Sequence, residues 1–257
     1  MKLYAMQCGV IYTDKSVLIA GAASQEFNIP VPYFLIEHEK GYVLFDSGHN
    51  QSTVNDIKTL PQPILDAVCP GELEGGFVLD ALKRAGVKPE DIMYHICSHL
   101  HFDHAGGIGL FPNATYVVQR QELHYAYVPD PFMKILYLRE DFDKDVNWLF
   151  LDGYNDNRYD LFGDGKIIIY YTPGHTPGHQ SLLVNLEKNG PVFLTVDSCY
   201  TLENLDGLLL SSLNANAQAA INSLQTIKDL QKRGVKIITG HDPDAWLSMK
   251  KFPEYYE

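Results

Sequence analysis

The run Ser98-His-Leu-His-Phe-Asp-His104 places three imidazoles and one carboxylate within seven residues. Histidine and aspartate are costly to bury without a partner, and such closely spaced groups repel one another when they are all protonated or unpaired. A divalent metal removes this conflict, because neutral imidazole and carboxylate are ligands for zinc and its first-row neighbours. The run therefore predicts a metal site.

Three further candidate ligands lie later in the chain. They are His175 in a Thr-Pro-Gly-His sequence, Asp197, and His241 directly after Gly240. With the four groups of the first run they make a set that is too large for one tetrahedral ion and suits two ions. The residues therefore predict a hydrolase with a dinuclear metal centre.

The spacing within the run agrees with a shared site. His99 and His101 can lie on one face of an extended segment, because side chains two residues apart point the same way. Asp103 and His104 then have to come from a turn, which Ala105-Gly-Gly107 allows. This geometry suits two ligands on one ion and two on its neighbour.

Three other residues are expected to support the ligands rather than bind metal. Asp46 and Asp242 are carboxylates that can accept a hydrogen bond from an imidazole and so orient its ring. His179 opens a predicted strand, where a supporting or packing role is favoured over ligation.

Hydrophobic periodicity predicts an α/β fold in which strand ends deliver the ligands. Residues 77–85, 120–127 and 216–233 have helical spacing, and Gly86 and Gly234 follow the first and the last of them. Short apolar runs predict strands at 1–10, 31–37, 41–46, 92–97, 115–119, 166–172, 180–186, 192–196 and 235–239. Ligand groups follow four of these strands, so strand ends can converge them on one point.

Composition narrows the class of protein. The chain has 257 residues, 46% of them hydrophobic, with 20 Lys and Arg against 32 Asp and Glu, a formal charge of −12. A core of this size excludes wholesale disorder, and the negative charge disfavours nucleic-acid binding. No apolar run approaches the roughly 20 residues of a membrane span. Four scattered cysteines without a Cys-x-x-Cys pair indicate reduced thiols in a cytoplasmic protein.

We expect one domain over residues 1–257. Residues 128–162 are aromatic, studded with charges and interrupted by Pro129 and Pro131. This irregular pattern is interpreted as an insertion, a lid or a subunit contact within the domain.

The motifs together resemble the metallo-β-lactamase superfamily. The resemblance rests on His-x-His-x-Asp-His with the following Ala-Gly-Gly107, on Thr172-Pro-Gly-His175, on the strand-end Asp197 and on Gly240-His241. It implies an αββα sandwich of two mixed sheets flanked by helices. Within the superfamily, the chain is most similar to the N-acyl homoserine lactone lactonases at residues 98–107, 118–120, 172–181, 194–201 and 240–242. Residues 240–246 and 252–256 resemble the branch that includes γ-butyrolactone-active lactonases.

The resemblance implies a role for each site residue. His99, His101 and His175 would bind one ion, and Asp103, His104 and His241 the other, while Asp197 and a hydroxide bridge the two. The ions would be zinc, with iron, manganese or cobalt as alternatives. Tyr200 matches the tyrosine that assists the substrate carbonyl, and Phe102 lies where the family lines its lactone pocket. A homodimer is a further family-based expectation.

The resemblance implies hydrolysis of an N-acyl homoserine lactone, the chemistry of quorum quenching. The bridging hydroxide would attack the ring, and Asp103 would take its proton and return it to the leaving alkoxide. One alternative is a catabolic hydrolase of γ-butyrolactone or another small lactone. A more distant one is a glyoxalase II-type thioesterase, which usually carries a basic C-terminal region, whereas only Lys250 and Lys251 follow His241 here. A protein that sequesters the signal without cleaving it is the non-enzymatic alternative.

Overall fold

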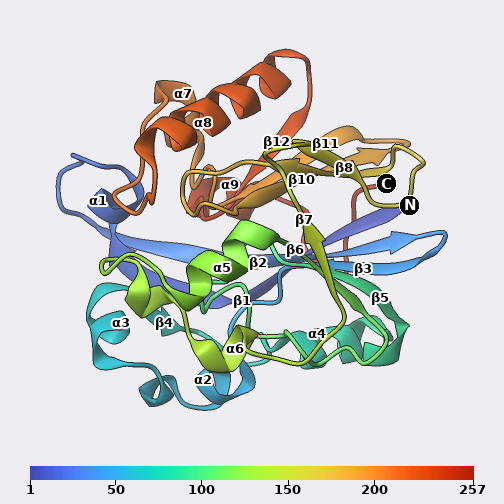
Figure 1. Cartoon of the computed structure of the whole chain (residues 1–257), viewed down its shortest axis with the longest axis horizontal. Coiled ribbons are helices and arrows are strands. Elements are labelled where there is room, and N and C mark those ends of the chain that lie inside the picture. The colour runs from blue at the N-terminus through green and yellow to red at the C-terminus, as the bar shows by residue number, and fades with distance from the viewer.

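The computed structural model, which describes residues 1–257, has two mixed β-sheets that pack face to face between layers of helices (Figure 1). The first sheet has the strand order β4-β1-β2-β3-β5-β6-β7 and the second β12-β11-β10-β9-β8. The strands of the first sheet are β1 (Lys2–Asp14), β2 (Glu26–His38), β3 (Gly41–Phe45), β4 (Cys69–Gly71), β5 (Ile92–Ile96), β6 (Thr115–Gln119) and β7 (Trp148–Leu151). Those of the second are β8 (Arg158–Asp160), β9 (Ile167–Tyr171), β10 (Gln180–Leu186), β11 (Gly190–Val196) and β12 (Lys236–Thr239).

The central strands are apolar on both faces because both faces are covered. In β2, residues 29–36 are all buried. Phe34 and Ile36 face the core between the two sheets, whereas Tyr33 and Leu35 belong to the core beneath the helices. Such near-continuous apolar runs are typical of strands enclosed on two sides.

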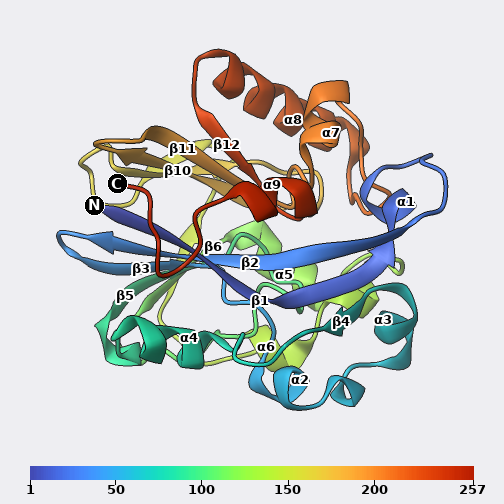
Figure 2. The same cartoon turned by 180° about the vertical axis from the view of Figure 1, so that it is seen from behind.

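Helices cover the outer face of each sheet, as the two opposite views show (Figures 1 and 2). Over the second sheet, Leu224, Ile227 and Leu230 of α8 pack with Phe193 of β11. Over the first sheet, α3 and α4 contribute to the largest apolar cluster. The helices are α1 (Lys15–Leu18), α2 (Gln51–Asn55), α3 (Gln62–Ala67), α4 (Val78–Ala85), α5 (Arg120–Tyr127), α6 (Arg139–Phe142), α7 (Leu202–Gly207), α8 (Ala217–Lys232) and α9 (Pro243–Ser248).

The two ends of the chain lie side by side. The amides and carbonyls of Leu3 and Tyr256 exchange hydrogen bonds of 2.8 and 2.9 Å, so the C-terminal residues extend the edge of β1. Figure 2 shows the N- and C-termini together at one end of the sandwich. No helix combines the length and the apolar character that crossing a membrane requires.

Most of the predicted elements are confirmed, and one interpretation is corrected. The hairpin of β2 and β3 is present, and α4 ends at Gly86, whose φ of 72° allows a left-handed cap. Residues 128–162, however, are not simply an insertion. β7 pairs with β6 in the first sheet and β8 pairs with β9 in the second, so the latter half of this segment is part of the sandwich. All four cysteines are free thiols, as expected.

Candidate metal centre

Four strand ends bring the seven predicted ligands to one place. The segment after β5 carries four of them, and the segments after β9, β11 and β12 carry one each. Since β5 belongs to the first sheet and the other three strands to the second, the site lies where the two sheets meet. The seven residues, His99, His101, Asp103, His104, His175, Asp197 and His241, are between 0% and 7% exposed.

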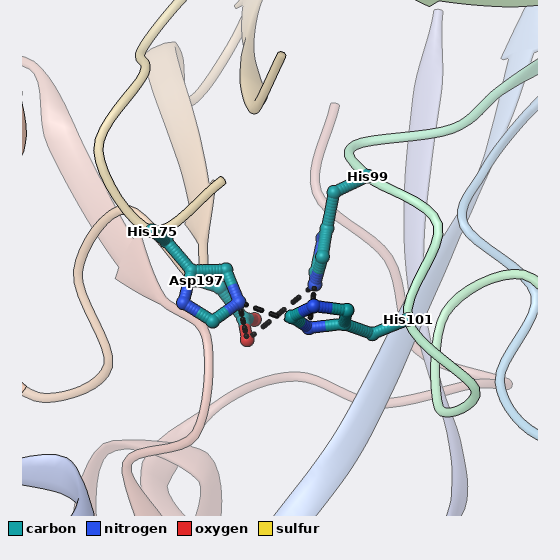
Figure 3. A group of neighbouring side chains, drawn as sticks. All are labelled: His99, His101, His175 and Asp197. Carbon is teal, nitrogen blue, oxygen red and sulfur yellow. Dashed lines mark hydrogen bonds and ion pairs between the residues drawn. The ribbon is translucent and has the colours of Figure 1, made fainter. Parts of the chain in front are cut away.

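The first group consists of His99, His101, His175 and Asp197 (Figure 3). Nδ1 of His101 lies 3.0 Å from Nε2 of His99 and 3.1 Å from Nε2 of His175. Oδ2 of Asp197 lies 3.4 Å from Nε2 of His175 and 3.8 Å from Nε2 of His99. Three nitrogens and one carboxylate oxygen therefore converge on one point.

The second group consists of Asp103, His104 and His241. Asp197 joins it through its other oxygen: Oδ1 lies 3.0 Å from Nε2 of His241 and 3.2 Å from Nε2 of His104. Oδ2 of Asp103 lies 3.4 Å from Nε2 of His104. Asp197 thus presents one oxygen to each group, which is the geometry of a bridging carboxylate.

Hydrogen bonds at the far nitrogens hold four of the rings. Nδ1 of His104 lies 2.9 Å from Asp46, and Nδ1 of His99 lies 2.9 Å from the hydroxyl of Ser98. Backbone carbonyls accept from the other two rings, that of Leu213 from His175 and that of Pro30 from His241, each over 2.7 Å. When Nδ1 carries the proton, the lone pair of Nε2 faces the site, as metal ligation requires.

Two strained backbone positions lie beside the ligands. Val196, directly before Asp197, has a φ of 43°, and Asp46, directly after β3, has a φ of 57°. A positive φ is rare for a residue with a Cβ and most unusual for a β-branched one. Such strained conformations persist only where the surrounding structure holds them in place. Here they direct the carboxylates of Asp46 and Asp197 toward the site.

The charged groups of the site act strongly on one another. Burial lowers the pKa of His99, and the neighbouring His104 and His101 lower it further. Burial also opposes the charged form of His104, but Asp103 and Asp197 outweigh it and raise its pKa. A proton on His104 therefore partly offsets the charge of two adjacent carboxylates.

The arrangement fits two divalent cations. With Nδ1 of His104 bonded to Asp46, its Nε2 makes no hydrogen bond and faces carboxylate oxygens of Asp103 and Asp197. Nitrogen and oxygen ligand atoms thus converge in a buried space, and divalent cations would offset the carboxylate charge that a proton on His104 offsets only in part. The two groups supply His and Asp donors suited to first-row metals.

A small pocket opens onto the two groups. Its floor includes ligand residues together with Phe102 and Tyr200, which are 2% and 6% exposed. Burial, followed by the charges of Asp197 and Asp103, raises the pKa of Tyr200, so its hydroxyl keeps its proton. The apolar wall is aliphatic and consists of Ile11, Val17, Leu18, Ile29, Val68, Leu136 and Leu213. No lysine or arginine lines the pocket.

The three predicted supporting residues make different contacts in the structure. Asp46 contacts His104 as described, and the ring of His179 packs 5.3 Å from that of His99 while its Nδ1 meets Thr172. Asp242 differs from the expectation, because its carboxylate accepts from backbone amides of Leu202, Asp244 and Ala245. It caps α9 instead of orienting His241.

Sequence reasoning missed the residue that links the loops of the first group. Glu122 of α5 is completely buried and bonds to both loops. Its one signal in the sequence is its spacing, since Glu122 and Ala126 lie four residues apart on the buried face of α5. The aliphatic wall was also missed, because its members come from segments far apart in the chain.

Comparisons with known proteins agree with this site. A family model described as the metallo-beta-lactamase superfamily matches residues 28–241. The N-acyl homoserine lactonase AttM of Azorhizobium caulinodans is 40% identical over 260 residues, covering 100% of this chain and 99% of that protein. The N-acyl homoserine lactonase AiiA of Bacillus thuringiensis subsp. kurstaki is 35% identical over 257 residues, covering 99% and 98%.

A solved structure is similar over nearly the whole length. It is an N-acyl homoserine lactone hydrolase with the product N-hexanoyl-L-homoserine bound at the catalytic metal center. The TM-score is 0.88 at 33% sequence identity, and the match covers 99% of this chain and 98% of that one.

Proposed function

Because the chain belongs to the metallo-β-lactamase superfamily, we propose that it is a hydrolase that opens the lactone ring of N-acyl homoserine lactones and so quenches quorum signals. One observation carries the proposal: a pocket with an aliphatic wall and no lysine or arginine ends at five of the seven predicted ligands, His101, Asp103, His175, Asp197 and His241. A neutral lactone with an apolar acyl chain matches both ends of this pocket.

The first group would hold one divalent ion and the second group another, with Asp197 between them. We propose zinc, which His and Asp ligands suit, although iron, manganese and cobalt share these ligands. Bound there, two such ions supply a nucleophilic water at neutral pH and a Lewis acid for the carbonyl oxygen.

The chain's own residues supply the proton transfers and hydrogen bonds. Asp103 lies at the floor of the pocket, where its carboxylate can take a proton from the attacking water and return it to the leaving alkoxide. Tyr200 keeps its proton in the same floor and can donate a hydrogen bond to the lactone carbonyl or ring oxygen. Phe102 would pack against the bound lactone.

The pocket also bears on the alternatives. A glutathione thioester carries carboxylates, and the lining residues offer them no cation. γ-Butyrolactone would occupy the floor of the pocket but would make no contact with the aliphatic wall. Burial of apolar surface against this wall favours a substrate that carries an acyl chain. A small-lactone hydrolase remains the second candidate.

The test is ring opening of acyl homoserine lactones with C6 to C12 chains and of γ-butyrolactone, followed by proton release with zinc-loaded protein. We expect turnover of the acylated substrates with kcat/KM higher than for γ-butyrolactone. Asp103→Asn and His104→Ala should abolish it. Asp242→Asn is the matched control, since Asp242 contacts only backbone amides.

Three other results would change the assignment. Turnover of γ-butyrolactone alone would indicate catabolism of small lactones. Cleavage of a glutathione thioester with every lactone left closed would contradict the substrate class while preserving the metal chemistry. Tight binding of acyl homoserine lactone without turnover would indicate a protein that sequesters the signal.

A further inference from the structure

Glu122 is a buried carboxylate without a cationic partner. It lies in the first turn of α5, it is 0% exposed, and no lysine, arginine or histidine forms an ion pair with it. A lone buried charge is strongly destabilising unless hydrogen bonds replace the lost water. Glu122 is therefore kept in the interior by what it binds.

Four donors from three segments satisfy this carboxylate. Oε1 accepts from the amide of Leu100 over 3.0 Å and from the hydroxyl of Tyr137 over 3.0 Å. Oε2 accepts from the hydroxyl of Thr176 over 2.6 Å and from the amide of Gly178 over 3.2 Å. All of its hydrogen-bonding capacity is directed at segments of the metal centre.

Two of these three segments carry the histidines of the first group. Leu100 lies between His99 and His101, and Thr176 directly follows His175. The loops come from strands of different sheets, and they meet at the start of β10, where the amide of Gln180 donates to the carbonyl of Ser98 over 2.9 Å. Glu122 joins them through one rigid group on a helix.

The loop after His175 also packs directly on the start of α5. A Cβ at Gly178 would lie only 2.3 Å from the amide nitrogen of Glu122, so only glycine allows this approach. Beneath it, the side chain of Gln119 donates to that of Gln180 over 2.8 Å. The helix end and the loop are thus held at one separation.

The third segment connects Glu122 to the pocket wall. The ring of Tyr137 meets that of His101 edge-on with centroids 4.5 Å apart. The neighbouring carbonyl of Leu136 accepts from the amide of Phe102 over 2.9 Å, and Leu136 lines the pocket. Because Nε2 of His101 makes no hydrogen bond, this ring is oriented by packing, and Tyr137 lies against it from the side of the pocket wall.

We propose that Glu122 is the positioning residue that sets the spacing between His175 and the His99–His101 pair and anchors the Tyr137 segment against them. The inference rests on the proposed function insofar as the first group is taken as a metal site. Glutamine is a poor replacement for Glu122, because in either orientation its NH₂ group faces a backbone N–H, that of Leu100 or that of Gly178, which cannot accept a hydrogen bond. Loss of the carboxylate should therefore weaken metal binding, even though Glu122 itself makes no contact with the substrate.

The test measures metal binding without any lactone. Purified Glu122→Gln, Tyr137→Phe and Thr176→Val are titrated with Zn²⁺ against a chromophoric chelator and, separately, loaded with Co²⁺ for absorption spectra. For Glu122→Gln we expect a dissociation constant for one ion about 10- to 100-fold higher and an altered Co²⁺ spectrum. Tyr137→Phe and Thr176→Val, which each remove one donor to Glu122, should weaken binding in the same direction by a smaller factor.

Asp141→Asn is the matched control, because it makes the same carboxylate-to-amide change at a buried residue that bonds to Asn50 instead. It should retain the Zn²⁺ affinity and the Co²⁺ spectrum of the parent protein. Thermal unfolding of the apo-proteins identifies any variant that does not fold. If Glu122→Gln is unfolded, the two single-donor variants decide.

The inference is overturned if the folded variants keep the Zn²⁺ affinity and the Co²⁺ spectrum of the parent protein, whatever their lactone turnover. Weakened metal binding in a protein that opens no lactone has the opposite meaning: the positioning role holds and the proposed substrate fails.

Discussion

The carboxylate of Asp46 supports a histidine in each half of the metal centre. It lies 2.9 Å from Nδ1 of His104, and it accepts from the hydroxyl of Ser98 over 2.7 Å. That hydroxyl lies 2.9 Å from Nδ1 of His99. One buried side chain, placed by a positive φ at the end of β3, thus orients rings that belong to different groups.

Asp46→Asn should therefore weaken the binding of both metal ions. An amide can present its NH₂ group to Nδ1 and favour the wrong tautomer of His104, so we expect a loss of about 10- to 100-fold in metal affinity. Chelator competition measures it, with kcat at saturating zinc as the second readout. Asp242→Asn, with its carboxylate on the α9 cap, should match the parent protein in both. Equal losses in the two variants would show that the effect is not specific to Asp46.

Tyr200→Phe tests the proposed hydrogen bond to the substrate. The ring, which packs 5.4 Å from that of His241, is retained, so binding of metal and lactone should change little. Loss of one preorganised donor should lower kcat by about 10²-fold, with KM nearly constant. Steady-state kinetics on a C6 lactone measure both constants. Tyr33→Phe is the control, since the hydroxyl of Tyr33 bonds to the carbonyl of Gly76 in the core; a kcat loss of similar size there would remove the assignment.

Val68→Phe tests whether the aliphatic wall receives the acyl chain. Val68 is 8% exposed and lines the pocket, so a larger side chain should fill space that a long chain occupies. We expect kcat/KM for a C10 lactone to fall by about 10-fold or more, and that for γ-butyrolactone to stay within about twofold. Val128→Phe, at a position 82% exposed, is the matched control. A uniform loss across chain lengths would mean that the chain binds elsewhere.

Asp141 gives a prediction about pH. Burial raises its pKa to about 7, although the Asn50 amide opposes the shift. Because the folded-state pKa exceeds the unfolded value of about 3.9, the carboxyl destabilises the fold increasingly as pH rises through this interval, and fully above about pH 7. Asp141→Asn should then raise the free energy of unfolding at pH 8, on the order of 1 to 4 kcal/mol, and leave it nearly unchanged at pH 4. Urea unfolding of the apo-proteins at both pH values measures this; a gain at pH 4 equal to that at pH 8 would refute the role of charge.

Much of the fold could be predicted because its signals are local. The β2–β3 hairpin, α4 with Gly86 and the long helix α8 follow from residue spacing and turn residues. The strands within residues 128–162 were not predicted, because β7 and β8 are short and pair with strands of different sheets. Asp242 misled because adjacency to His241 says nothing of where a carboxylate points, and a nearby helix start offered it three amides.

By itself, the sequence determined the chemistry of the centre. Four ligands lie within six consecutive positions, 99–104, and the other three follow strands, so their residue types and spacing already indicated two metal ions. Only the tertiary structure decided which oxygen of Asp197 faces which group, that Glu122 joins the two histidine loops, and that segments from Ile11 to Leu213 form one apolar wall. The physical reason is range: ligand identity is a property of individual side chains, whereas bridging, positioning and enclosure depend on distances between segments that meet only when the two sheets pack.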